Sequence, residues 1–98
     1  MAKPSLLITR PLPDVVVDAA RAVCDVTMQP VNDYYRADDC AMAMVKFDAV
    51  LATLGDSFGA AAFEAALQPR CRLIANFGVG YNHIDVRAAA KKGMTVTN

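Results

Sequence analysis

Two glycines that follow an apolar run are the residues of this sequence best suited to bind an anion. Gly78 and Gly80 belong to the stretch NFGVGYNHID, residues 76–85. Exposed backbone amides in such a loop, here those of Val79 and Gly80, can bind a small anion such as a carboxylate. A purely structural role is equally open, because glycine permits a positive φ where a strand ends.

The same loop fails as a dinucleotide site. The fingerprint G-x-G-x-x-G needs a third glycine for close packing of helix on strand, and that position is His83. The helix that would face the phosphates begins too late, because its best N-cap is Asp85, whose carboxylate already occupies the free N–H groups and repels an anion. We therefore expect no NAD and no metal at this loop.

Apolar segments that alternate with helical ones predict the fold that positions the loop. Short apolar runs end at glycine, proline or polar residues, which is typical of buried parallel strands, and helices between them favour right-handed crossovers. The strands are expected at 5–9, 25–29, 48–54, 72–77 and 94–98. The helices are expected from Asp14, over 36–46, after a cap at Asp56 or Ser57, and from Asp85 to a left-handed Gly93. We expect an α/β, flavodoxin-like, doubly wound five-stranded parallel sheet of order 2-1-3-4-5, without a closing C-terminal helix.

Composition limits the function further. The 98 residues suffice for one domain, and ten basic residues balance ten acidic ones, so neither nucleic acid nor a membrane surface is an expected partner. Hydrophobic residues make up 55% of the chain and the mean hydropathy is +0.27. Because no helix follows the last strand, we expect a piece of a longer protein, with an apolar face that self-association could cover.

The three cysteines indicate a reducing compartment. Cys24, Cys40 and Cys71 are odd in number and widely spaced, which does not fit a disulfide framework or a zinc site. We expect them to be small buried hydrophobic residues. No signal-like or membrane-spanning segment is present, so the expected location is cytoplasmic.

The string LIANFGVGYNHIDVRAAAKKGMTVTN, residues 73–98, closely resembles the D-2-hydroxyacid dehydrogenase family, most of all its glyoxylate/hydroxypyruvate reductase branch. FDAVLATLGDSF, residues 47–58, is similar to that family's third strand and the loop after it. LLITRPLP, residues 6–13, is similar to its first strand and turn. The order and spacing fit across the whole chain.

The resemblance implies that residues 1–98 are part of a flavodoxin-like substrate-binding domain. An NAD(P)-binding Rossmann domain, inserted in the family after this point, would be absent. The parent would use NAD or NADP to reduce 2-keto acids such as glyoxylate or hydroxypyruvate to D-2-hydroxy acids. The family's catalytic Arg, Glu and His lie further along, so this chain would hold no catalytic residue, bind no cofactor and be inactive alone. His83 would have a structural role.

The resemblance also assigns a substrate site. Backbone amides of the glycine loop would hold the substrate carboxylate, and the loop after the third strand would border it. The implied substrate-binding residues are Leu54, Gly55, Asp56, Gly78, Val79 and Gly80.

Three other interpretations remain. A receiver module would need acidic residues after the first strand, where the sequence is TRPLP, and Asp56 without such partners is more typical of a helix cap. A flavin module would need a Ser/Thr-rich phosphate loop, which RPLPD does not supply. The chain could also be a half-domain excised or engineered for the study of folding and self-association, with no activity of its own.

Overall fold

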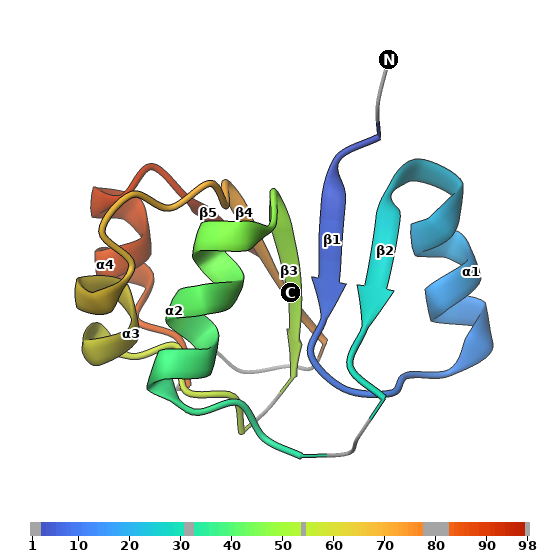
Figure 1. Cartoon of the computed structure of the whole chain (residues 1–98), viewed down its shortest axis with the longest axis horizontal. Helices are drawn as coiled ribbons and strands as arrows, with labels where there is room; N and C mark the ends of the chain where they lie inside the picture. The colour runs from blue at the N-terminus through green and yellow to red at the C-terminus, as the bar shows by residue number, and fades with distance from the viewer. Residues whose placement is uncertain (1–2, 31–32, 54, 78–82, 98) are drawn as a thin grey trace.

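The alternation of strands and helices predicted from the sequence is confirmed. The computed structural model describes residues 3–30, 33–53, 55–77 and 83–97. Within these residues the strands are β1 Ser5–Ile8, β2 Asp25–Met28, β3 Ala49–Thr53, β4 Leu73–Phe77 and β5 Thr95–Thr97. The helices are α1 Asp14–Val23, α2 Ala37–Lys46, α3 Ala60–Ala65 and α4 Val86–Lys91. All strand pairs are parallel, in the predicted order β2-β1-β3-β4-β5 (Figure 1).

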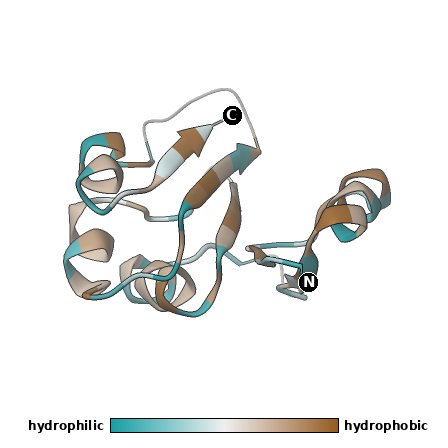
Figure 2. Ribbon diagram, turned by 90° about the horizontal axis from the view of Figure 1, so that it is seen from above, coloured by the Kyte–Doolittle hydropathy of each residue, from teal (hydrophilic) through white to brown (hydrophobic). Residues whose placement is uncertain are grey.

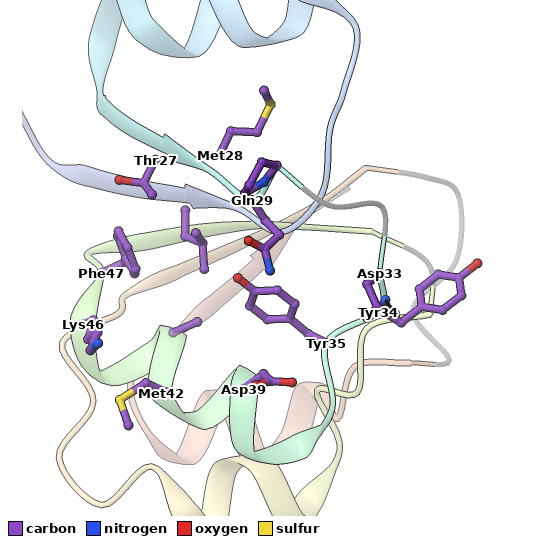
Figure 3. Close-up of a pocket in the computed structure, with 13 residues that line it drawn as sticks. Thr27, Met28, Gln29, Asp33, Tyr34, Tyr35, Asp39, Met42, Lys46 and Phe47 are labelled. Atoms are coloured by element: carbon purple, nitrogen blue, oxygen red, sulfur yellow. Dashed lines mark hydrogen bonds between the residues drawn. The ribbon is translucent and has the colours of Figure 1, made fainter.

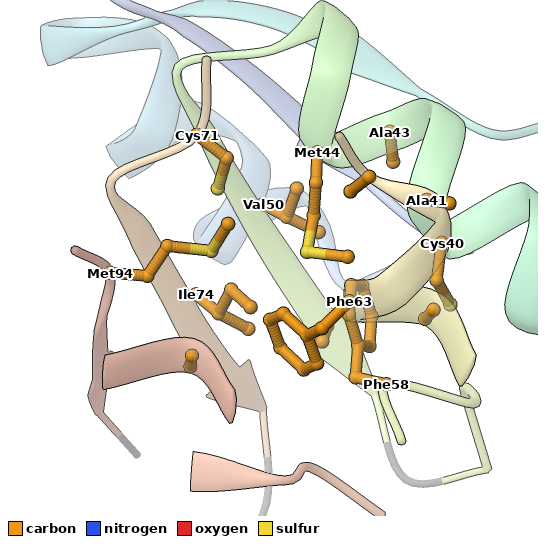
Figure 4. Close-up of a cluster of buried hydrophobic side chains, with 14 of the residues drawn as sticks. Cys40, Ala41, Ala43, Met44, Val50, Phe58, Phe63, Cys71, Ile74 and Met94 are labelled. Atoms are coloured by element: carbon orange, nitrogen blue, oxygen red, sulfur yellow. The ribbon is translucent and has the colours of Figure 1, made fainter. Parts of the chain in front are cut away.

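Helices α2, α3 and α4 cover one face of the sheet, and α1 lies against the other (Figures 1 and 2). The parallel register aligns Leu7, Val50, Ile74 and Val96 across the sheet, and all four belong to the core beneath α2, α3 and α4. Phe58 and Phe63 fill the space between this face and the helices (Figure 4). Strand residues that alternate with these, such as Leu6 and Ile8, point to the opposite face and pack with Val17 of α1.

The face on the α1 side is covered over β2 and β1 but less completely over β4. Leu73 and Phe77 project to that side, one at each end of β4, and are 37% and 43% exposed. Thr95 and Thr97 of β5 are exposed on the same side. This incompletely covered face agrees with the apolar excess of the composition.

The helix ends match the predicted punctuation with one exception. Asp85 caps α4, because its carboxylate accepts the N–H of Ala88 at 3.0 Å, and Gly93 has φ +77°. The expected cap of α3 at Asp56 or Ser57 is wrong: the N-cap is Gly59, and no side chain caps this helix. Asp56 is instead directed into the protein, as described below.

At the opposite, amino edge of the sheet, the carboxylate of one aspartate connects the starts of two strands with the loop before β4. Asp48, just before β3, accepts hydrogen bonds from the N–H of Ser5 at 2.8 Å and from Nε of Arg70 at 2.7 Å. Its own N–H donates to Oγ of Ser5 at 3.0 Å. The Arg70 guanidinium, together with the bonds from Ser5, lowers the pKa of the Asp48 carboxyl.

The cysteines are free, as the sequence predicts. Cys40 and Cys71 are fully buried, and burial raises the pKa of both thiols, which keeps them protonated and unreactive. Cys24 is only half-buried, so the expectation of burial is met less completely there. Among the described residues, no helix has both the length and the apolar character needed to span a lipid bilayer.

Candidate functional site at the carboxyl edge of the sheet

The loops singled out by the sequence follow neighbouring strands. The register pairs Thr53, the last residue of β3, with Phe77, the last residue of β4. The chain leaves both strands at the carboxyl edge of the sheet, where open α/β sheets bind their ligands. Two of the predicted substrate-binding residues, Gly55 and Asp56, are described by the structure. Leu54, Gly78, Val79 and Gly80 lie outside the described residues.

Gly55 is held in a conformation that favours glycine. Its φ is +105°, and the ring of Tyr34 lies directly against its Cα. A Cβ at this position would come within 2.4 Å of Cε1 of Tyr34. The guanidinium of Arg10 lies over the same ring, 4.5 Å from its centroid. Arg10, two residues after β1, and Gly55, two residues after β3, thus both contact the ring of Tyr34 in the loop before α2.

Asp56 is fully buried and its carboxylate is fully engaged. Oδ2 accepts the hydroxyl of Thr9 at 2.5 Å, the N–H of Thr53 at 2.9 Å and the hydroxyl of Thr53 at 3.2 Å. Oδ1 accepts the N–H of Tyr35 at 3.0 Å. Burying a carboxylate is tolerated only where donors replace water, and four donors do so here. The carboxylate therefore faces the protein interior.

The residues that follow the glycine loop, His83 to Asp85, are hydrogen-bonded to the chain that follows β3. Residues 76–83 are here called the glycine segment. The N–H of Phe58 donates to the carbonyl of His83 at 3.1 Å, and the N–H of Asp85 donates to the carbonyl of Phe58 at 2.8 Å. These two bonds make Phe58 and Ile84 an isolated parallel bridge. Phe77 and His83, which flank residues 78–82, are thereby held at the same edge of the sheet.

His83 makes a second connection, to the end of β4. Its Nε2 lies 2.8 Å from Oδ1 of Asn76, which is buried. Because that oxygen accepts, Nε2 carries the proton, and Nδ1 is the unprotonated acceptor nitrogen. Within the described part of the chain, Nδ1 is buried and has no hydrogen-bond partner. Charging the ring would add a buried N–H without an acceptor, which fits the effect of burial: it lowers the pKa of His83, against an opposing effect of Asp56.

Stability is therefore expected to fall as the pH drops below neutral. The folded pKa of His83 lies below its ordinary value of about 6.5, so its contribution is fully present above that pH and is lost as the pH falls through the folded pKa. His83 is the only histidine of the sequence, which makes the slope assignable. Urea unfolding between about pH 7.5 and 5.5 should show the loss in the wild type and much less of it in His83→Gln. Equal slopes in both proteins would contradict this assignment.

A cavity that the sequence did not predict lies beside this edge, between β2 and α2. Its volume is about 410 Å³, and Tyr35, Gln29 and Phe47 contribute to its lining. Tyr35 points into the space between the strand and the helix, whereas Tyr34 points away (Figure 3). Burial, together with the nearby carboxylates of Asp39 and Asp56, raises the pKa of the Tyr35 phenol. Periodicity gave no signal for this cavity, because it forms where α2 leaves the edge strand β2 uncovered.

The described residues offer no metal-binding cluster. No three of their His, Cys, Asp or Glu side chains gather closely enough to hold a metal ion. The groups at the carboxyl edge include backbone amides, threonine hydroxyls and one neutral histidine around an internally satisfied carboxylate. Such a set can shape a binding loop.

Comparison with known proteins decides the family. The model of the catalytic domain of the D-isomer specific 2-hydroxyacid dehydrogenases matches residues 6–98. The chain belongs to this family. A glyoxylate reductase from Thermococcus gammatolerans is 31% identical over 96 residues, which are 98% of this chain and 28% of that protein. The chain thus spans less than a third of the length of this family member.

Solved structures agree with the fold. A 2-hydroxyacid dehydrogenase from Ketogulonicigenium vulgare superimposes with a TM-score of 0.71 at 29% identity, over 100% of this chain and 30% of that one. A Polaromonas protein described as an NAD-binding member of the family gives a TM-score of 0.85 at 21% identity, over 96% and 29% of the two chains. The sheet order described above is thus that of a family domain.

Proposed function

We propose that this chain forms part of the substrate-binding domain of an NAD(P)-dependent D-2-hydroxyacid dehydrogenase that reduces glyoxylate or hydroxypyruvate. The proposal is supported by family membership and by the similarity to glyoxylate reductase over nearly the whole chain. The NAD(P)-binding Rossmann domain and the catalytic Arg, Glu and His belong, in this proposal, to sequence outside these 98 residues.

Within the chain, the amides of Val79 and Gly80 are proposed to hold the substrate carboxylate, and Leu54 and Gly55 to border it. The observation that carries this assignment is the bridge between Phe58 and Ile84. It holds His83 to Asp85, which follow residues 78–82, beside Phe58, which follows Gly55 by three residues, and so supports the proposal that the two loops form one site. Backbone amides suit a carboxylate because they recognise its charge without a counter-ion that must be desolvated.

The nicotinamide would supply the hydride that is transferred to the carbonyl carbon, while an acid outside these residues protonates the oxygen. The glycine loop does not fit the dinucleotide itself, because His83 replaces the third glycine and Asp85 already caps α4. The 98-residue chain is therefore expected to bind a carboxylate weakly and to turn nothing over. NADH or NADPH oxidation with glyoxylate, above a buffer blank, would overturn the expectation of inactivity.

The binding step is tested by nuclear magnetic resonance. Glycolate, the hydroxy acid product of glyoxylate reduction, is titrated into the isotope-labelled chain, and glycolamide serves as the neutral control of the same size. We expect saturable shifts of backbone amides at Gly55, at residues 77–84 and nowhere on α1. Equal shifts with glycolamide, or no saturation with glycolate, would refute the proposed carboxylate site.

Turnover is tested in a chimera. Residues 1–98 replace the matching segment of the Thermococcus gammatolerans glyoxylate reductase, which supplies the rest of a complete enzyme. We expect NAD(P)H oxidation that depends on glyoxylate or hydroxypyruvate, and the ratio of kcat/KM values ranks the two acids. A folded chimera that oxidises NAD(P)H with neither acid would count against this substrate class.

Self-association without activity is a second candidate, favoured by the exposed side chains of Leu73 and Phe77 on one face of β4. In that case sedimentation should show a dimer at micromolar concentration that Leu73→Lys converts to a monomer. Leu67→Lys, at an 80% exposed position after α3, is the control. A monomer in the wild type would exclude this candidate.

We also propose a cytoplasmic location for the protein. The three free cysteines, two of them fully buried, suit a reducing compartment. Fractionation of cells that express the native gene, with detection by an antibody, checks the location, and recovery from a membrane or secreted fraction would contradict it.

A further inference from the structure

Residues 56–58, here named the crosspiece, bond to several loops at the carboxyl edge. Asp56 binds Thr9 after β1, Thr53 at the end of β3 and Tyr35 before α2. The next residue repeats one of these connections, because the N–H of Ser57 donates to the carbonyl of Tyr35 at 2.9 Å. Both backbone groups of Tyr35 are therefore bonded to the crosspiece.

The third residue of the crosspiece extends the connection to the glycine segment. Phe58 is fully buried and forms the bridge with Ile84, through bonds of 3.1 Å and 2.8 Å to the backbone of His83 and Asp85. The crosspiece thus links the ends of β1 and β3 and the segment before α2 with His83 to Asp85, at the end of the glycine segment. The buried side chains of Phe58 and Asp56 fix the position of the crosspiece relative to these elements.

We propose that Asp56 is a positioning residue, which through the crosspiece holds Gly55 and His83 to Asp85, the described residues next to the proposed substrate-binding loops, and does not itself touch the substrate. The inference rests on the proposed function, and it replaces direct substrate contact by Asp56 with an indirect role. The four donors on its carboxylate come from the protein itself, so a substrate could reach it only by breaking those bonds. Gly55 immediately precedes the crosspiece, and Phe58 is bonded to His83 and Asp85, where the glycine segment ends.

Asp56→Asn tests this role, because an amide cannot reproduce the bonding. If its NH₂ group lies at the Oδ1 position it faces the N–H of Tyr35, and at the Oδ2 position it faces the N–H of Thr53. One connection is lost in either orientation, with little change in volume. Asp18→Asn, the same chemical change at an exposed position of α1, is the matched control.

Two measurements are made on the 98-residue chain. Amide hydrogen exchange should quicken at Tyr35 or Thr53 and also at Asp85, which contacts Phe58 and not Asp56, while Ala62 of α3 is unchanged. The glycolate dissociation constant should rise about tenfold in Asp56→Asn, which equals the smaller losses seen when a residue that orients a metal ligand through a hydrogen bond is removed. Asp18→Asn should change neither quantity.

The outcomes separate this inference from the function on which it rests. If the wild type binds glycolate and Asp56→Asn binds it equally well, the positioning role is refuted and the function stands. If the wild type does not bind, the function fails, and unchanged exchange at Asp85 would refute the coupling as well. Should Asp56→Asn not fold, Thr9→Val replaces it, because that variant removes one donor at nearly constant volume and should give the same changes at smaller size.

Discussion

Replacing Phe63 with alanine is expected to lower the free energy of unfolding by about 3–5 kcal/mol, a large share of the roughly 5–15 kcal/mol typical of a domain. Phe63 is 2% exposed and lies between α3 and the sheet, beside Phe58 and Ile74 (Figure 4). Helix α3 has only six residues, so it depends on this side chain for its attachment. Urea unfolding followed by circular dichroism measures the loss.

Leu67→Ala provides the control for this variant. Leu67 follows the same helix and is 80% exposed, so the change should stay within about 0.5 kcal/mol. A loss below about 1 kcal/mol for Phe63→Ala would mean that the side chain does not fill the core as described.

Gly55→Ala should have the second largest effect, a loss of about 1.5–4 kcal/mol in the free energy of unfolding. A φ of +105° strains any residue with a Cβ by about 1–3 kcal/mol. The new Cβ would also displace the ring of Tyr34, which is 56% exposed and can swing outward only by leaving Arg10. That contact is worth about 0.5–1 kcal/mol at an exposed site. Thermal and urea unfolding give the total.

The contributions to Gly55→Ala can be separated. Gly93→Ala carries backbone strain without a collision, because its φ is +77° and no atom lies within 4 Å of the position of a Cβ. In a Tyr34→Ala background, the stability lost in Gly55→Ala should come only from backbone strain and should approach the loss in Gly93→Ala. If removing the Tyr34 ring does not lower the cost of Gly55→Ala, the ring is not what restricts this position.

The strand order could be predicted from the sequence because each element carries its own local signal. The runs around Leu7, Val50 and Ile74 are apolar, end at polar or glycine residues, and are joined by helical segments, which leaves few arrangements of a parallel sheet. The cap at Asp85 and the left-handed Gly93 are equally local, and both are confirmed. The described strand ends differ from prediction by at most one residue, as at Thr9, which follows β1 and begins the carboxyl-edge loop.

Asp56 could not be placed in the same way. An aspartate followed by a serine and a helical segment is typical of a cap, and nothing adjacent to it indicates burial. Its partners Thr9 and Tyr35 lie 47 and 21 residues away in the chain, so only the folded sheet brings them together. The cavity beside Tyr35 escaped prediction for the same reason. Local patterns predict elements, whereas these features arise from contacts between elements.

The cluster of Asp48, Ser5 and Arg70 gives the domain a second closure at the edge of the sheet opposite the candidate site. The two edges of the sheet can therefore be engineered independently of each other. Affinity tags, fluorophores or thermostabilising substitutions belong at the amino end, near Arg70, where they leave the loops of the carboxyl end undisturbed. Changes to the proposed substrate-binding loops belong at the carboxyl end, where they leave the cluster around Asp48 intact.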